Sequence, residues 1–228
     1  MDNDFMKMIS LLTALMLLFV HHVSAEESNP NEWLFYPSIG MSFSKISFTR
    51  PAGTLNALNK TLNLGVTATD RNYYVNVQAE LFGKSNFKNG NEFTSVERED
   101  QTLTIGKIFK RSSMFIGYTD SETKDDFLGE FHFDKGLFLG GGYDFPVGNS
   151  RLGLTLAYAS LDGKIFKDAS GLLESGKTQG LSYGVSLSGP FRKDMGYKLL
   201  LRYRSYKFDS GAVVTDKNIL SLSGAIIF

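Results

Sequence analysis

The chain has 228 residues, no cysteine, and 24 basic residues against 24 acidic ones, so its formal net charge at pH 7 is zero. The absence of cysteine excludes disulfides, thiolate metal sites and a lipid-attached N-terminal cysteine, and the balanced charge argues against nucleic acid as a partner. Apolar residues alternate with small or polar ones instead of forming helical stripes, which predicts one domain made of β-strands.

The first 25 residues have the pattern of a secretory signal peptide. An apolar run over residues 9–20 is followed by Val23-Ser24-Ala25, which predicts cleavage after Ala25 and a mature domain over residues 26–228. The run is shorter than the roughly 20 apolar residues of a spanning helix, so we expect no transmembrane helix. Two aspartates make the extreme N-terminus acidic, whereas such regions are normally basic. Translation from Met6 is therefore an alternative to translation from Met1.

Ten segments of period-two alternation follow, each bounded by turn-forming residues. They cover residues 33–48, 61–69, 73–82, 96–109, 114–120, 131–145, 151–166, 178–191, 195–208 and 214–228. Short connections at 70–72, 110–113, 146–150 and 192–194 alternate with longer ones at 49–60, 83–95, 121–130, 167–177 and 209–213. Short turns on one rim and longer loops on the other predict a closed antiparallel up-and-down transmembrane β-barrel with both termini in the periplasm. We predict ten strands. Eight or twelve are alternatives, because the 49–60 loop could hold a helix and strand limits are uncertain by several residues.

One face of these strands carries large apolar side chains, and the other carries mostly small ones. Apolar rows include Leu152, Leu154, Leu156 and Tyr158, and also Leu199, Leu201 and Tyr203; small rows include Ser38, Gly40, Ser42 and Ser44, and also Gly136, Gly140 and Gly142. The outer face of a soluble barrel would carry many lysines and glutamates, whereas a narrow lumen has room chiefly for small side chains. We therefore predict a small-residue lumen and an apolar face toward lipid.

Aromatic residues gather at both ends of the apolar rows. Tyr73, Phe109, Tyr143, Phe145, Phe191, Tyr197 and Phe228 lie beside the short turns, and Phe133, Tyr158, Tyr183 and Tyr203 lie toward the long loops. Amphipathic rings prefer the two headgroup levels of a membrane, so this placement predicts two aromatic belts.

The last strand ends on an apolar row formed by Phe228, Ile226, Leu222 and Leu220, with Gly224 as a gap. With the signal peptide and the alternation over residues 33–228, it resembles the small outer-membrane β-barrel proteins of Gram-negative bacteria. The resemblance implies a location in the outer membrane, contact with outer-membrane lipid and lipopolysaccharide, and recognition of this terminal row by the barrel assembly machinery. Gly224 departs from the pattern. No single family is selected, and no oligomeric state is predicted.

Several charged residues are expected to face the lumen. Lys198, Arg202 and Arg204 share one row of their strand, Glu80 lies on a strand across the ring, and Asp144 lies near the periplasmic end. Such charges either line a selective path or pair across the lumen and close it. We expect pairing of Arg202 or Arg204 with Glu80, because an unpaired buried charge is costly and the arginine fork suits carboxylates. An open path with this cationic row would favour small anions.

Catalytic, metal and cofactor sites are not predicted. His132 and Asp134 form an inward-facing pair near the outer rim, and ten-stranded omptin proteases also use Asp and His there, but no second aspartate pair or deep cleft accompanies them. The loop at 121–130, together with Asp120 at the end of the preceding strand, is acidic, and we interpret it as a solvated tip. The loop at 83–95, together with residues 97–100 of the following strand, is of mixed charge, and its lysines could contact lipopolysaccharide phosphates.

The sequence therefore predicts an integral outer-membrane barrel that is porin-like or structural, with at most a narrow channel for small solutes. The alternative is a surface adhesion or interaction protein that uses the barrel as an anchor. An outer-membrane enzyme, omptin-like or lipid-modifying, is the third hypothesis.

Overall fold

The computed structural model describes residues 33–228 except 51–52, 71, 82–84, 90–91, 126–128, 168–170 and 193–194, so the predicted signal peptide lies outside the described residues. The strands are β1 (Leu34–Arg50), β2 (Gly53–Thr69), β3 (Tyr73–Leu81), β4 (Ser85–Asn89), β5 (Glu92–Phe109), β6 (Ser112–Asp125), β7 (Glu130–Val147), β8 (Ser150–Lys167), β9 (Gly171–Arg192), β10 (Met195–Asp209) and β11 (Val214–Ile227). Over these ranges no helix is long and apolar enough to cross a membrane.

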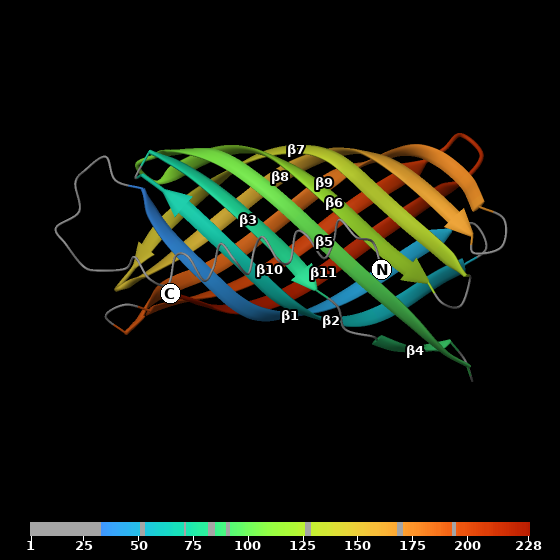
Figure 1. Cartoon of the computed structure of the whole chain (residues 1–228), viewed down its shortest axis with the longest axis horizontal. Helices are drawn as coiled ribbons and strands as arrows, with labels where there is room; N and C mark the ends of the chain where they lie inside the picture. The colour runs from blue at the N-terminus through green and yellow to red at the C-terminus, as the bar shows by residue number, and fades with distance from the viewer. Residues whose placement is uncertain are drawn as a thin grey trace.

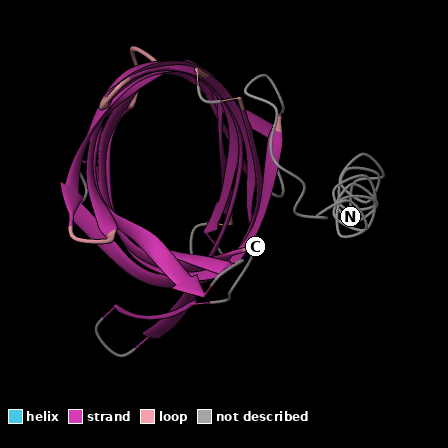
Figure 2. Ribbon diagram, turned by 90° about the vertical axis from the view of Figure 1, so that its left-hand side faces the viewer, coloured by secondary structure: helices cyan, strands magenta, loops and turns pink. Residues whose placement is uncertain are grey.

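Ten of the strands close into one antiparallel ring (Figures 1 and 2). Consecutive strands pair around the sheet, β1 pairs with β11, and β3 pairs directly with β5. The seam between β1 and β11 runs from Ser38 opposite Ile227 to Thr49 opposite Asp216. The remaining strand, β4, is short and pairs with the outer end of β5. The predicted ten-stranded barrel is confirmed, with β4 as an added strand.

Most strands are longer than predicted, and they gain most of their length at the loop end, whereas β3 and β11 are each one residue shorter. The prediction of a loop at 49–60 is wrong, because β1 and β2 pair as far as Arg50 opposite Gly53. Most of the predicted loops at 83–95, 121–130 and 167–177 likewise belong to strands. A strand of 18 residues is about 60 Å long and rises about 45 Å at a typical tilt, roughly 20 Å more than the apolar band of a membrane barrel. The barrel wall therefore projects beyond the lipid.

The outer face carries the apolar band that the alternation predicted. Leu154, Leu156, Leu199 and Leu201 are 43–50% exposed on this face although each is fully apolar. Apolar side chains gathered on this scale on an outer surface indicate contact with lipid.

The two aromatic belts are confirmed with one correction. On the loop side, Tyr158, Tyr183 and Tyr203 are exposed at the upper end of the apolar rows. Phe133 lies farther out: it is opposite Lys164 and packs against Phe166, with ring centroids 5.4 Å apart. It therefore lies beyond the charged pair Lys135 and Asp162, which face each other on β7 and β8.

The lumen is not lined by small residues alone, which corrects the prediction. Aromatic side chains on the inward face lie directly opposite a glycine of the neighbouring strand: Tyr74 opposite Gly106, Phe115 opposite Gly140, Phe138 opposite Gly117 and Tyr206 opposite Gly180. The rings lie over these glycines, because a Cβ built on Gly117 would be 2.1 Å from Cζ of Phe138 and one on Gly106 would be 2.3 Å from Cε1 of Tyr74. Small residues thus provide the space into which the inward rings fold.

Candidate functional site

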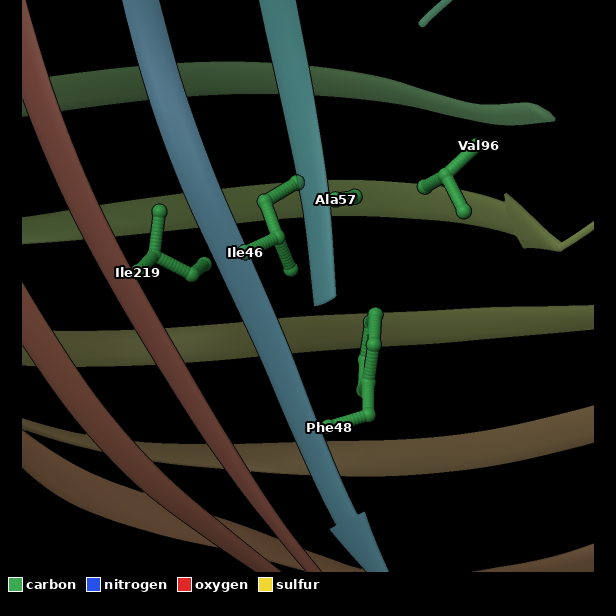
Figure 3. Close-up of a cluster of buried hydrophobic side chains, with 5 residues drawn as sticks. All are labelled: Ile46, Phe48, Ala57, Val96 and Ile219. Carbon is green, nitrogen blue, oxygen red and sulfur yellow. The ribbon is translucent and has the colours of Figure 1, made fainter. Parts of the chain in front are cut away.

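The candidate site is the outer half of the barrel interior, which is filled with side chains. Along β1 the inward row Ser42, Ser44, Ile46 and Phe48 is at most 7% exposed. Ile46 and Phe48 form an apolar cluster with Ala57, Val96 and Ile219, which come from β2, β5 and β11 (Figure 3). Apolar side chains inside the ring at this depth replace the water that a pore would contain.

A charged cluster centred on Asp100 spans the interior between β5 and β10. Asp100 is 3% exposed and accepts two hydrogen bonds from Arg98, at 2.5 and 3.1 Å, and one from Arg204 at 2.8 Å. Arg204 also reaches Glu80 at 3.5 Å. The predicted pairing of Arg204 with Glu80 is confirmed, but the shorter contact of Arg204 is to Asp100.

Arg98 and Asp100 are functional candidates that the sequence reading missed, because it grouped both with the mixed charges of the preceding loop although they lie within the strand predicted at 96–109. In the structure they lie on the inward face of β5, and Arg98 also donates a hydrogen bond to Thr123 at 2.9 Å. Their spacing carried the signal. Every second residue of a strand points to the same face. Arg98 and Asp100 therefore share the inward face with Thr102 and Thr104, which lie in the membrane-level part of the strand.

A second buried cluster joins β7, β9 and β11. Asp134 is 6% exposed, bonded to Lys217 at 2.8 Å and to the Thr178 hydroxyl at 2.5 Å. The Lys217 ammonium also lies 5.6 Å from the centre of the Phe48 ring, within the range of a cation–π contact. A cavity of about 10 Å³ borders this cluster, and such a volume admits about one water molecule. The interior is therefore tightly packed at this level.

His132 and Asp134 both face inward as predicted, but they belong to different clusters. His132 Nε2 lies 3.0 Å from Arg50 Nη2 and 3.4 Å from Glu130, while Asp134 bonds Lys217. The His132 ring packs against Phe48, with centroids 5.5 Å apart. The contacts of His132 and of Asp134 thus link different strands at the outer rim of the barrel.

The rim cluster has a pH signature. Glu130 bonds Arg50 at 2.7 Å, and hydrogen bonding with His132, helped by Arg50, lowers the pKa of Glu130 to about 2. A carboxyl group whose pKa is depressed by folding contributes stability above its unfolded pKa, about 4.5, and loses it as the pH falls through the folded value.

We expect acidification from pH 4.5 to 2 to loosen this rim, because protonation of Glu130 removes the anion that Arg50 and His132 share. The measurement is the protection of the amides at the β1–β2 and β7 ends against hydrogen exchange, taken relative to the intrinsic exchange rate at each pH. In Glu130→Gln, this protection should already be low at pH 6 and should change little below it. An unchanged pH profile in this variant would contradict the assignment.

Lys198, Arg202 and Asp144 lie in the other half of the interior, toward the periplasmic turns. Their rows face inward as predicted, but Lys198 and Asp144 are exposed and Arg202 is half-buried. Thr155, on the inward face of β8, is also exposed. Exposure thus increases from the outer half, where inward side chains are buried, toward the periplasmic end.

Residues 120–125 of the acidic segment interpreted as a solvated tip belong to β6, and Glu130 belongs to β7. Asp120 lies beside Lys135 of β7, with 2.7 Å between the charged atoms. In the same register row, Lys135 faces Asp162 of β8, which bonds Lys177 of β9. This row of alternating charges lies just beyond the apolar band. Asp120 and Asp162 each bond a lysine of the neighbouring strand. Asp120 thus belongs to a strand and is paired, so its interpretation as part of a solvated loop tip is wrong.

A closed antiparallel ring with an apolar outer band, aromatic belts and a short-turn rim defines an outer-membrane β-barrel. No family model and no curated protein matches the sequence. Solved structures of similar fold include Neisserial surface protein A (11% identity, TM-score 0.43, covering 86% of this chain and 99% of that one). The outer membrane protease OmpT of Escherichia coli has 10% sequence identity and a TM-score of 0.48, and the match covers 90% of this chain and 99% of that one. The translocator domain of the autotransporter NalP of Neisseria meningitidis has 12% identity and a TM-score of 0.43, with 96% of each chain covered.

Proposed function

We propose that the protein is a structural outer-membrane barrel whose lumen is closed on the outer side, and that it does not form an open pore. The observation that carries this proposal is the continuous filling of the outer half by the Asp100 cluster, the Asp134 cluster and the apolar cluster around Ile46. Charges that pair across a narrow lumen close it to ions instead of guiding them. The long-strand rim beyond the lipid is then the part of the protein that is presented to the surroundings.

Planar-bilayer conductance tests this proposal. We expect the refolded mature chain to show no discrete conductance steps. The double variant Arg98→Ala, Arg204→Ala should open small steps, because both cations that bind Asp100 and fill the lumen at this level are removed. Lys177→Ala, which removes a lysine of the outer surface, is the matched control and should stay silent. Steady conductance of the unaltered chain would overturn the proposal, and heat-modifiable gel migration would confirm that each variant is folded.

One observation favours a second function, interaction at the cell surface. Phe131 and Phe133 stack with centroids 6.5 Å apart, and Phe133 meets Phe166 edge-on on the outer face of β7 and β8, beyond the charged row. Aromatic side chains outside the lipid band suit a protein or carbohydrate partner. The double variant Phe133→Ser, Phe166→Ser should reduce adhesion of cells that carry the protein, while unchanged adhesion would remove this candidate.

A further inference from the structure

Two cations of the periplasmic half lack the partners that every inward cation named above in the outer half possesses. Arg50 bonds Glu130, Arg98 and Arg204 bond Asp100, and Lys217 bonds Asp134. In the part of the chain that the structure describes, the side chains of Lys198 and Arg202 form no ion pair and no hydrogen bond. Their charges are therefore available to a ligand.

The residues that lie opposite the two cations on the neighbouring strands are small. On the neighbouring strands, Lys198 lies opposite Ser188 and Ala225, and Arg202 lies opposite Gly184 and Ser221. Beside these small side chains Lys198 is exposed and Arg202 is half-buried. Ser188 adds a hydroxyl, whereas the buried Ser221 hydroxyl already bonds Ser44 at 2.9 Å. The two Cα atoms are about 13 Å apart along the strand, and flexible side chains of this length can converge on one group between them.

The acids of this region do not neutralise the pair. Glu80 is engaged by Arg204 at 3.5 Å. Asp144 is the carboxylate whose charge acts on Lys198, and it lies exposed near the periplasmic rim. Tyr206 lies four residues farther along the same inward row of β10. The charges of Glu80 and Asp100 act on Arg202, but among the described residues no carboxylate forms an ion pair with it. A guanidinium fork binds phosphate or carboxylate oxygens in a bidentate manner.

We propose that Lys198 and Arg202 form a binding site for a small oxyanion, carrying a phosphate or carboxylate group, that enters from the periplasmic end. Access from this end follows from the exposure of the inward side chains of Lys198, Asp144 and Thr155. The direction of entry rests on the proposed closure of the outer half, whereas the site itself does not. The protein thus receives a ligand from the periplasm within a lumen that ends blindly toward the outside.

Isothermal titration of the refolded full barrel in detergent tests the site, with pyrophosphate, inorganic phosphate and acetate as separate probes. We expect one-to-one binding of at least one probe, weakened at least tenfold in Lys198→Gln and in Arg202→Gln. Arg202→Lys keeps the charge and should lose less than Arg202→Gln. The control Lys207→Gln removes an exposed lysine from the outward face of the same strand and should bind as the unaltered chain does.

Absence of binding for all three probes, or equal binding in all variants, would overturn the site. Retention of heat-modifiable migration shows that lost binding does not come from unfolding. The outcome is separable from that of the conductance experiment, because a conducting barrel that still binds pyrophosphate through Arg202 would contradict the closed lumen and confirm the oxyanion site.

Discussion

Replacing Asp100 by asparagine is expected to lower the free energy of unfolding by about 3–5 kcal/mol, the usual cost of leaving a buried charge without its partner. The substitution keeps the shape of the side chain but removes the anion shared by Arg98 and Arg204, which bond it at 2.5 and 2.8 Å. Arg204 would retain only the longer contact to Glu80. Urea unfolding in lipid vesicles, followed by tryptophan fluorescence of Trp33, measures the change.

Asp162→Asn is the matched control for Asp100→Asn. Asp162 also bonds a cation, Lys177, but both side chains are more than 60% exposed on the outer wall, and exposed ion pairs contribute little to stability. The urea midpoint of this variant should stay close to that of the unaltered chain. Equal destabilisation by the two substitutions would contradict the assignment of Asp100 as a buried centre of charge.

Replacing Gly117 by alanine is the second substitution with a large expected effect, because the lumen has no space for the added methyl group. The new Cβ would lie 2.1 Å from Cζ of Phe138 and 2.6 Å from the Leu103 carbonyl oxygen. Overpacking of this kind typically costs about 1–3 kcal/mol, and the backbone oxygen cannot rotate away as a side chain can. The same unfolding assay should show the loss, accompanied by slower refolding into vesicles.

The control for this prediction is Gly224→Ala, at a glycine on the lipid-facing side of β11. There the added Cβ would have its nearest neighbour, Leu199 Cδ2, at an ordinary 3.5 Å. We expect stability to be unchanged or slightly increased, since the outer face gains apolar surface toward lipid. A destabilisation equal to that of Gly117→Ala would show that glycine flexibility, and not ring packing, is what matters at both sites.

The membrane-level part of the barrel was predictable because lipid imposes a strict alternation on it. Leu152 to Tyr158 and Leu199 to Tyr203 show this period, and the strands that contain them lie where the sequence placed them. The terminal row ending on Phe228 is exposed on the outer face, as the pattern required. Its recognition by the assembly machinery stays a prediction, as do contact with lipopolysaccharide and cleavage after Ala25.

Beyond the lipid the side chains still alternate between the two faces, but both faces are polar there. The alternation of apolar and polar residues is therefore lost, which explains why the strand ends were missed. On β5, Glu97 and Glu99 face outward and Arg98 and Asp100 face inward, so both faces are charged at the loop end of the predicted strand. The pairing with β6 shows which of the two alternating rows faces the lumen. Long-range pairing, such as Asp134 with Lys217 across 83 positions, has no local signature in a single sequence.

Single-cysteine labelling tests the closed outer lumen most directly, because the native chain has no cysteine and each new thiol is then the only one. We would introduce Ser44→Cys in the filled outer half, Thr155→Cys on the exposed inward face and Ser160→Cys on the outer wall, and add a membrane-impermeant maleimide to intact cells or to isolated envelopes open to both sides. The closed barrel predicts labelling of Ser160→Cys in intact cells, of Thr155→Cys only when the periplasmic side is accessible, and of Ser44→Cys in neither preparation. Labelling of Thr155→Cys in intact cells would show a path through the barrel and contradict the closed lumen.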